Sequence, residues 1–314
     1  MPMALILAAM ISTVSPAVAD TPRLVIDVAT LGVAGVESVS RVDDRAVYRP
    51  VVANSATPPR SRYSLTIPLD TAQPGLPRPR IFGRPDRPLV VIDAGHGGHD
   101  PGASSPQSGA REKDVTLAMA RAIRDELLKG GRVRVALTRD NDRFLILQER
   151  TELARALKAD LFISVHADAA PTPDAYGATI YTLSEVASDR KAAQLAAREN
   201  KADIINGVNL SGAGADISSI LIDLAQRETM NASSRFADLL KREGSAMPFR
   251  NDYHQMAGFV VLKAPDTPSI LLEVGYLTNA TDVARITSSE GKASVATGIR
   301  RAVDVHFARR FASR

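Results

Sequence analysis

The stretch PLVVIDAGHGGHDPGAS, residues 88–104, decides the fold because it joins an apolar run to a loop that carries a histidine. The four consecutive apolar residues from Leu89 to Ile92 are typical of a short strand that is buried on both faces. The following loop holds His96 among four glycines, which allow a backbone to approach a ligand closely. His96 therefore lies at the carboxyl end of a central strand, where open α/β sheets bind ligands.

Three other residues suited to metal or proton chemistry stand at the ends of predicted elements. Glu112 opens a segment with apolar residues at helical spacing, His166 ends the strand-like run LFISVH, and Glu273 ends the apolar run in SILLEVGY. Two imidazoles and a carboxylate at one sheet edge match the His₂Glu ligand set of a catalytic zinc ion, which leaves a fourth position for water. The carboxylate that is not a ligand is then the natural general base.

These residues belong to four motifs in a fixed order: GHGGHDPGA, Glu112 at the head of a helix, SVHADA and ILLEVGYLTN. In this order the motifs resemble the zinc-dependent N-acetylmuramoyl-L-alanine amidases of the type 3 amidase family, and the likeness covers residues 86–309. The resemblance implies that His96, Glu112 and His166 bind Zn²⁺ and that Glu273 is the general base. It also implies hydrolysis of the amide between N-acetylmuramic acid and L-alanine of the peptidoglycan stem peptide, in cell-wall remodelling and daughter-cell separation.

Three positions depart from the residues usual in these motifs. Asp168 stands where the family often carries Asn, Tyr276 where Phe is common and Thr278 where Ser is common. None of the three is a proposed zinc ligand, so the departures concern contacts with the substrate. We expect Asp168 to lie in the vicinity of the substrate, together with His99 of the glycine-rich loop and His254 of the polar stretch NDYHQM.

Six apolar runs predict a twisted, mostly parallel or mixed six-stranded α/β sheet flanked by helices. The predicted strands are residues 89–92, 133–137, 161–165, 178–183, 259–262 and 270–272. Helical patterns follow the first, second, fourth and sixth of these runs. In the last helical pattern, residues 294–311, His306 shares the apolar stripe and is expected to be a packing or surface residue.

A helical insertion, residues 184–256, interrupts this alternation. Residues 192–205 and 217–241 have helical composition and are joined by the flexible stretch GVNLSGAGAD. In division-associated amidases of the family, such an insertion places a glutamate in the open zinc position until an activator protein, here expected to carry a LytM-type domain, withdraws it. The stretch ARENKADIING resembles that element, so Glu199 is the candidate regulatory residue; the alternative is an ordinary solvated helix residue.

The amino-terminal part allows two interpretations. Residues 1–19 are apolar and end in Ala-Val-Ala, as before a signal-peptide cleavage site, although no basic residue precedes the run and Pro16 interrupts it. Alternatively, the chain begins inside an upstream domain, because TPRLVIDVA has a strand pattern and resembles the tail of a wall-targeting β domain. We favour a cleaved signal peptide, which predicts a periplasmic protein without a transmembrane anchor in the mature chain. Residues 20–87 are expected to form a partial β segment and a Pro/Arg-rich linker, and residues 88–311 the catalytic domain.

Composition narrows the class of protein without naming a substrate. The 314 residues are 45% hydrophobic and 24% charged, which is typical of a soluble globular protein. The net charge of +4 suits an anionic polymer such as the cell wall, but such charges are common without a polyanionic partner, and nothing else indicates nucleic acid. The absence of cysteine excludes disulfides and thiolate metal sites.

Three rival interpretations remain at this stage. The first is another zinc hydrolase of wall polymers, either a peptidase or a deacetylase. The second is a catalytically silent wall-binding protein, which would have no need of all four proposed metal and base groups. The third is a phosphate-binding loop, but the glycine-rich stretch lacks the Gly-Lys-Ser/Thr sequence of a P-loop.

Overall fold

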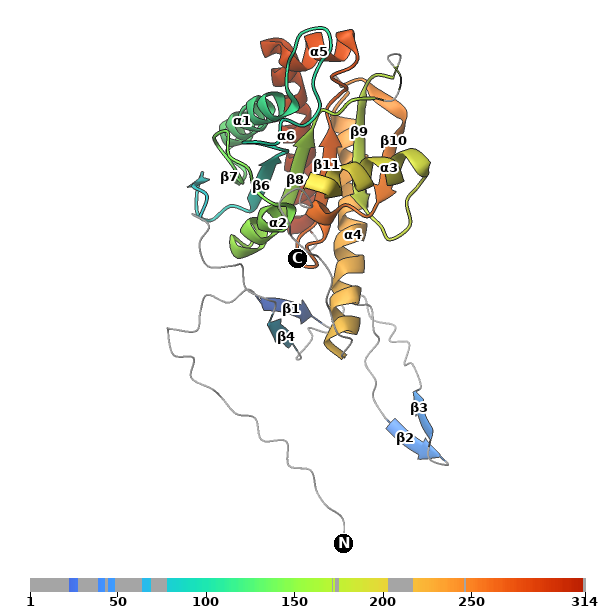
Figure 1. Cartoon of the computed structure of the whole chain (residues 1–314). Helices are drawn as coiled ribbons and strands as arrows, with labels where there is room; N and C mark the ends of the chain where they lie inside the picture. The colour runs from blue at the N-terminus through green and yellow to red at the C-terminus, as the bar shows by residue number, and fades with distance from the viewer. Residues whose placement is uncertain are drawn as a thin grey trace. The chain divides into compact units, whose positions relative to one another are not determined.

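The computed structural model describes residues 78–202 and 217–312, except residues 171, 173, 174 and 246, together with four strands nearer the amino terminus (Figure 1). The chain divides into two compact units, residues 1–71 and 72–314. In the first unit, β1 pairs with β4 and β2 with β3, both in antiparallel fashion. The bounds of these strands are β1 (Arg23–Asp27), β2 (Val39–Val42), β3 (Arg45–Tyr48) and β4 (Ser64–Pro68).

β1 lies in the stretch with the predicted strand pattern, whereas the other three strands lie where a linker was expected. The expected leader, residues 1–19, falls outside the described residues.

A mixed sheet of seven strands forms the centre of the second unit, in the order β10-β9-β11-β8-β6-β7-β5. β7, β6, β8 and β11 are parallel, β9 is antiparallel to β11, β10 is parallel to β9, and β5 is antiparallel to β7. The bounds of these strands are β5 (Ile81–Phe82), β6 (Leu89–Ala94), β7 (Arg134–Leu137), β8 (Leu161–His166), β9 (Ala178–Leu183), β10 (Phe249–Ala257) and β11 (Ser269–Glu273). The predicted mixed α/β sheet is confirmed, with seven strands instead of six.

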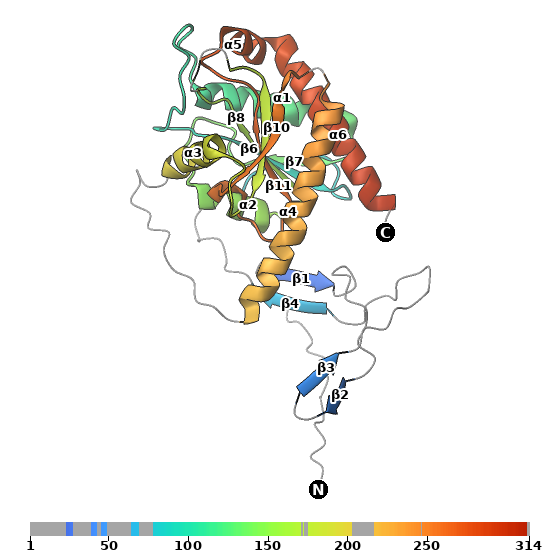
Figure 2. The same cartoon turned by 90° about the vertical axis from the view of Figure 1, so that its right-hand side faces the viewer.

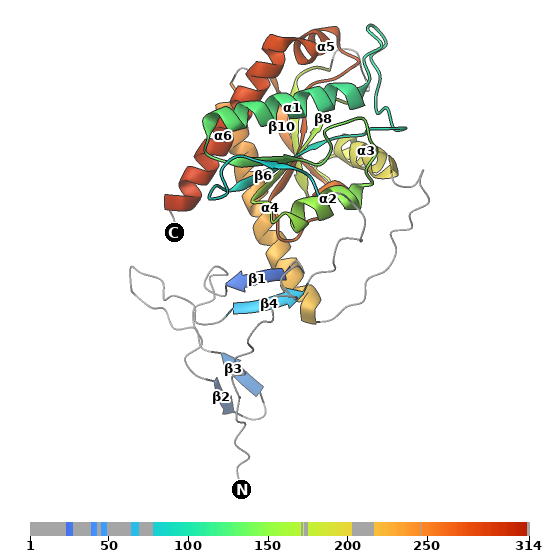
Figure 3. The same ribbon diagram turned by 90° about the vertical axis from the view of Figure 1, so that its left-hand side faces the viewer.

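Helices cover both faces of this sheet, as the alternation of apolar runs and helical patterns predicts (Figures 2 and 3). On β6, Val90 and Ile92 pack in the core cluster that includes α1, α4, α5 and α6, whereas Leu89 and Val91 pack in the cluster with α2, α3 and η4. The helix bounds are α1 (Glu112–Gly130), α2 (Leu147–Ala156), α3 (Arg190–Glu199), η2 (Asn200–Ala202), α4 (Ile217–Glu243), η4 (Val260–Leu262), α5 (Ala280–Thr287) and α6 (Ser289–Ala312).

One predicted strand is wrong. The run from Phe259 to Leu262 contains the 3₁₀ helix η4 and packs in the cluster with α2 and α3. A short apolar run indicates burial but does not distinguish a strand from a helical turn. The prediction missed two strands, β5 and β10, which lie at the two edges of the sheet. The polar residues of β10 are mostly half-buried or exposed because it is an edge strand.

The insertion contains the two helices that its composition predicts. α3 and η2 form its first half and α4 most of its second, while the joining stretch GVNLSGAGAD lies outside the described residues. The predicted end of the insertion at residue 256 is too late, because β10 (Phe249–Ala257) is a strand of the main sheet. α4 contributes Phe236, Ala237 and Leu240 to the main core cluster. None of the helices in the described parts of the chain is long and apolar enough to cross a lipid bilayer.

The register of the parallel strands brings together the carboxyl ends of β6, β8 and β11, which carry or precede the candidate site residues. β11 and β8 are parallel neighbours with Glu273 opposite His166, and β6 and β8 are parallel neighbours with Ala94 opposite Val165. The loop that carries His96 therefore starts beside His166, at the same edge of the sheet as Glu273.

Candidate metal centre

The loop after β6 holds His96 in a constrained conformation. His96 has a φ of 61°, a left-handed value that is uncommon for residues other than glycine. Two buried guanidinium groups fix the backbone before and at this position. Arg139 donates hydrogen bonds to the carbonyl oxygens of Ala94 and Gly95, each at 2.8 Å, and Arg150 donates to those of Ala94 and His96 at 2.7 and 2.9 Å.

A buried carboxylate compensates the charge of Arg150. Asp93 Oδ1 accepts hydrogen bonds from Arg150 at 2.9 Å and from Thr138 at 2.6 Å, and its Oδ2 accepts one from Ser164 at 2.7 Å. Burial opposes ionisation, but Arg150, Thr138 and Ser164 together lower the pKa of Asp93. A charged network on β6, β8 and neighbouring elements therefore supports the loop that carries His96.

Four side chains converge at this edge of the sheet. Glu112 Oε2 lies 3.1 Å from His96 Nε2, and Glu112 Oε1 lies 3.2 Å from His166 Nδ1. Glu199 Oε2, from the end of α3, lies 3.3 Å from His166 Nδ1 and 3.6 Å from His96 Nε2. One ligand atom each from His96, His166 and Glu199 lies within 4.8 Å of the other two, a spacing at which the three could hold a metal ion.

Two glycines make this close packing possible. A Cβ atom on Gly95 would lie 2.5 Å from the imidazole of His166. A Cβ atom on Gly102, which has a φ of +63°, would lie 2.7 Å from both Glu112 and the ring of His96. Both distances are below any normal contact, so the glycine-rich loop is required for the two imidazoles and the carboxylate to meet.

The cluster is oriented by further hydrogen bonds. Asp100 Oδ2 lies 2.8 Å from His96 Nδ1, which leaves Nε2 to face the carboxylates. Glu112 accepts hydrogen bonds from the backbone N–H groups of Ala103 and Ala167, each at 2.9 Å. A carboxylate on the far nitrogen of a histidine ring is the arrangement that orients metal-bound histidines.

The electrostatics of the cluster call for a positive charge. Burial disfavours a charged imidazole, but Glu112 and Asp100 raise the pKa of His96 well above its ordinary value. His96 Nε2 is buried and faces the carboxylate oxygens of Glu112 at 3.1 Å and Glu199 at 3.6 Å. An imidazole nitrogen that faces carboxylate oxygens in this way suits a divalent cation, which would take the place of the proton, and nitrogen and oxygen ligands without thiolates fit Zn²⁺.

Glu273 lies next to this cluster and is fully buried. Its Oε2 accepts a hydrogen bond of 3.0 Å from the backbone N–H of Asp168, while its Oε1 is buried and has no partner within the described residues. Burial, followed by the charges of Glu112 and Glu199, raises the pKa of Glu273 well above its ordinary value. A carboxyl group with a raised pKa beside a metal site is suited to general acid–base chemistry.

Of the remaining predicted site residues, the fold places Asp168 beside the cluster but not His99 or His254. Asp168 is buried beside Glu273 and forms an ion pair with Arg198 of α3. His99 is exposed and its ring contacts that of Phe144, with a centroid distance of 4.3 Å. His254 lies on the edge strand β10, where its Nε2 is 2.9 Å from the hydroxyl of Thr182. Neither His99 nor His254 has a recorded contact with the imidazole–carboxylate cluster.

Sequence reasoning missed the supporting residues. Asp100 stands within the GHGGHDPGA motif, four residues after His96, so its position was a usable signal. Arg139, Arg150 and Arg198 carried no such signal, because charged residues in helices or after strands are usually solvated. Their function becomes visible only when the chain folds.

Comparison with known proteins is consistent with this geometry. Residues 90–305 match the family described as N-acetylmuramoyl-L-alanine amidase, and the chain belongs to this family of type 3 amidases. The chain is 37% identical over 240 residues to the amidase AmiC of Escherichia coli O6:H1, a match that covers 76% of this chain and 57% of AmiC. It is 34% identical over 235 residues to AmiA of Escherichia coli K12, covering 74% of this chain and 81% of AmiA. The chain thus spans little more than half of AmiC.

Solved structures show the same fold. The amidase AmiC2 of Nostoc punctiforme superposes with a TM-score of 0.50 and 27% identity, covering 71% of this chain and 98% of AmiC2. The catalytic domain of CwlV from Bacillus (Paenibacillus) polymyxa gives a TM-score of 0.50 and 26% identity, covering 70% of this chain and 98% of that domain.

Proposed function

We propose that this chain is a zinc-dependent peptidoglycan amidase that hydrolyses the amide between N-acetylmuramic acid and L-alanine of the stem peptide. The observation that carries the proposal is the meeting of His96, His166 and Glu112 at one sheet edge, with buried Glu273 beside them. Membership of the amidase family supports this choice over a wall peptidase or deacetylase. Family membership equally supports an active amidase over a catalytically silent wall-binding protein.

In this proposal His96, Glu112 and His166 hold the zinc ion. When bound, zinc lowers the pKa of a coordinated water to about 7 and polarises the substrate carbonyl. Glu273 accepts the proton of the attacking water on its unpartnered Oε1 and returns it to the leaving amine of L-alanine. Asp100 keeps His96 Nε2 directed at the metal position, and Arg139 and Arg150 hold the backbone of the loop.

The proposal includes autoinhibition by α3. Glu199 contacts both imidazoles, which is the position that a fourth ligand would take. While Glu199 occupies that position, water and substrate are excluded, and basal activity is low. A partner with a LytM-type domain would draw α3 away, in the periplasm, during separation of daughter cells. The contacts of Glu199 support the blocking role, and the resemblance to division-associated amidases supports the partner and the cellular setting.

The test is hydrolysis of purified peptidoglycan followed by product analysis. We expect released peptides with free amino-terminal L-alanine, loss of activity after chelation, and recovery on addition of zinc. New reducing sugar ends or cleaved peptide cross-links would instead indicate a different wall hydrolase. Metal analysis without zinc, or full activity after replacement of both His96 and His166 by Ala, would overturn the metal assignment.

A further inference from the structure

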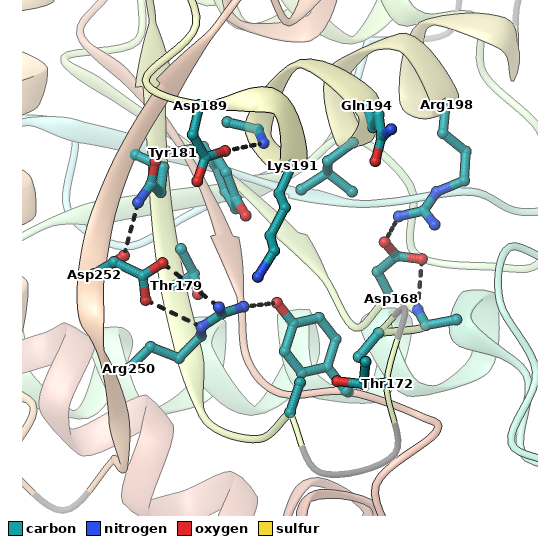
Figure 4. Close-up of a pocket in the computed structure, with 17 residues that line it drawn as sticks. Asp168, Thr172, Thr179, Tyr181, Asp189, Lys191, Gln194, Arg198, Arg250 and Asp252 are labelled. Atoms are coloured by element: carbon teal, nitrogen blue, oxygen red, sulfur yellow. Dashed lines mark hydrogen bonds and ion pairs between the residues drawn. The ribbon is translucent and has the colours of Figure 1, made fainter.

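A cavity of about 420 Å³ opens beside the metal centre (Figure 4). Its walls come from α3, β9, β10 and the segments that follow β8 and β11. Asp168, which lines one end, bonds through its backbone to Glu273, and Thr179 of the same cavity stands opposite Glu273 in the β9–β11 register. The cavity therefore begins at the proposed general base and extends away from it.

The charged groups of this cavity leave one cation without a partner. Asp168 is paired with Arg198, Asp189 accepts the backbone N–H of Ala192 at the start of α3, and Asp252 lies 3.2 Å from Arg250. Lys191 extends from α3 toward Arg250 in Figure 4, and it forms no recorded ion pair with any residue that the structure describes. Two cations that point into one cavity repel each other, and an anion between them would offset that repulsion.

Arg250 is fixed in place for such a contact. It is half-buried and donates a hydrogen bond of 2.5 Å to the hydroxyl of Tyr276, a residue that is itself 6% exposed. Tyr276 follows Glu273 by three residues, so the guanidinium group is tied to the segment that carries the proposed base. A guanidinium group held by a buried tyrosine is preorganised to bind a carboxylate.

Other lining groups indicate a peptide as the source of that carboxylate. Gln255 Oε1 is buried and has no hydrogen-bond partner among the described residues, so it is free to accept a hydrogen bond from an amide N–H. Small apolar residues complete the walls and offer room for methyl groups: Ala169, Ala170, Ala175 and Ala192. Three aspartates line the same space, which disfavours a doubly charged phosphate.

We propose that this cavity is the subsite for the stem peptide and that Arg250, positioned by Tyr276, selects a substrate with a free carboxylate on the residue after L-alanine. The inference rests on the proposed amidase function. Arg250 and Tyr276 belong to β10 and to the segment after β11, so they stay in place when α3 moves. Lys191 belongs to α3 and adds to the anion site only while α3 covers the cavity.

The test compares two muramyl peptides that differ in one group. Both contain N-acetylmuramoyl-L-alanine; the next residue is D-glutamate with a free α-carboxylate in one and its α-carboxamide in the other. We expect wild-type kcat/KM to be at least about 10-fold higher for the carboxylate, the effect of one charge-assisted hydrogen bond. Arg250→Gln should remove this preference by raising KM for the carboxylate alone, and Tyr276→Phe should weaken it.

Arg242→Gln is the matched control, because Arg242 is an exposed arginine paired with its neighbour Glu243. Its kinetics should equal those of the wild type. Unchanged preference in Arg250→Gln, or an equal loss on both substrates with normal zinc content and thermal stability, would overturn the subsite. If neither the wild type nor Glu199→Ala, in which the proposed block is removed, cleaves either compound, the amidase proposal fails by itself. Calorimetric binding of acetyl-L-Ala-D-Glu and its carboxamide then decides the subsite, which requires carboxylate binding that depends on Arg250.

Discussion

The two helices of the insertion are attached to the sheet in different ways. α4 places large apolar side chains in the main core cluster, among them the fully buried Phe236 and Leu240. α3 contributes only Ala192, Ala196 and Leu195 to the smaller cluster.

Beyond those apolar contacts, α3 reaches the body of the protein through polar groups. Glu199 contacts the two imidazoles and Arg198 pairs with Asp168. Just beyond its carboxyl end, Asn200 donates a hydrogen bond to the carbonyl of Gly258 and accepts one from the N–H of Val260, each at 2.9 Å.

This difference in contacts indicates that α4 mainly stabilises the fold and that α3 is better suited to regulate the site. Removing α4 from the sheet would expose large apolar surface, at a cost of roughly 25 cal/mol per Å². Removing α3 would expose little apolar surface and mainly exchange polar contacts for water, which costs far less. We therefore expect the sequence neighbours α3 and α4 to have separate tasks: α4 stabilises the fold, and α3 is the segment that we propose to move.

The largest effect should follow from Glu273, the proposed general base, and it sharpens the comparison by defining the activity that α3 is proposed to control. Replacing Glu273 by Gln keeps the shape but removes the proton acceptor, so turnover should fall by about 10²- to 10⁴-fold. The loss should persist when Glu199→Ala is added, because release of α3 cannot supply a base. Zinc content and peptidoglycan hydrolysis are measured together. A near-normal rate would move the base elsewhere, with Glu199 or Asp168 next in line.

On α4, Phe236→Ala should lower the free energy of unfolding by about 3–5 kcal/mol, the usual cost of deleting a buried phenyl group. On α3, Leu195→Ala should cost less, because in our proposal α3 separates from the sheet without global unfolding. Urea denaturation of both variants measures the difference. Equal losses would show that α3 is as much a part of the core as α4.

Glu199→Ala should raise basal activity on purified peptidoglycan without changing zinc content. A shift from about 1% to 99% open requires roughly 5.5 kcal/mol, so loss of a single ligand should open the site only in part. Arg198→Ala is a useful companion, since it breaks the ion pair with Asp168 and leaves Glu199 in place. Unchanged or reduced activity in Glu199→Ala with the metal still bound would show that Glu199 does not block the site.

The smallest expected effect is a loss of stability at acidic pH, caused by protonation of His306 where α4 packs on α6. His306 lies against Phe236, with ring centroids 5.4 Å apart, and burial, aided by Arg310 and Arg235 and opposed by Asp160, lowers its pKa to about 4. The unfolded chain binds this proton near pH 6.5, so stability is complete above that pH and falls as the pH drops toward 4.

The contribution of His306 is at most about 3 kcal/mol. His306→Gln should flatten the dependence of unfolding free energy on pH between 6.5 and 4. An unchanged slope would show that His306 does not control this interface.

Much of the fold and of the candidate site was predictable because it depends on neighbours along the chain. Three features were predicted correctly: the apolar run of β6, the helical spacing of α1 and the start of α4 at Ile217. Each depends on the burial or periodicity of consecutive residues, which the sequence shows directly. His166 and Glu273 end strands and His96 follows one, so the predicted order of elements already placed the three at one sheet edge.

Contacts between distant residues were decided only by the tertiary structure. The apolar run at Phe259 forms a 3₁₀ turn because it is buried against helices α2 and α3. The polar strand β10 forms because it pairs with β9 at the edge of the sheet, where polar side chains are tolerated. Arg139 and Arg150 became supports of the His96 loop, and Glu199 met two imidazoles. Such contacts depend on the geometry of the packed sheet, because the charge and polarity of a residue do not specify which distant group it will meet.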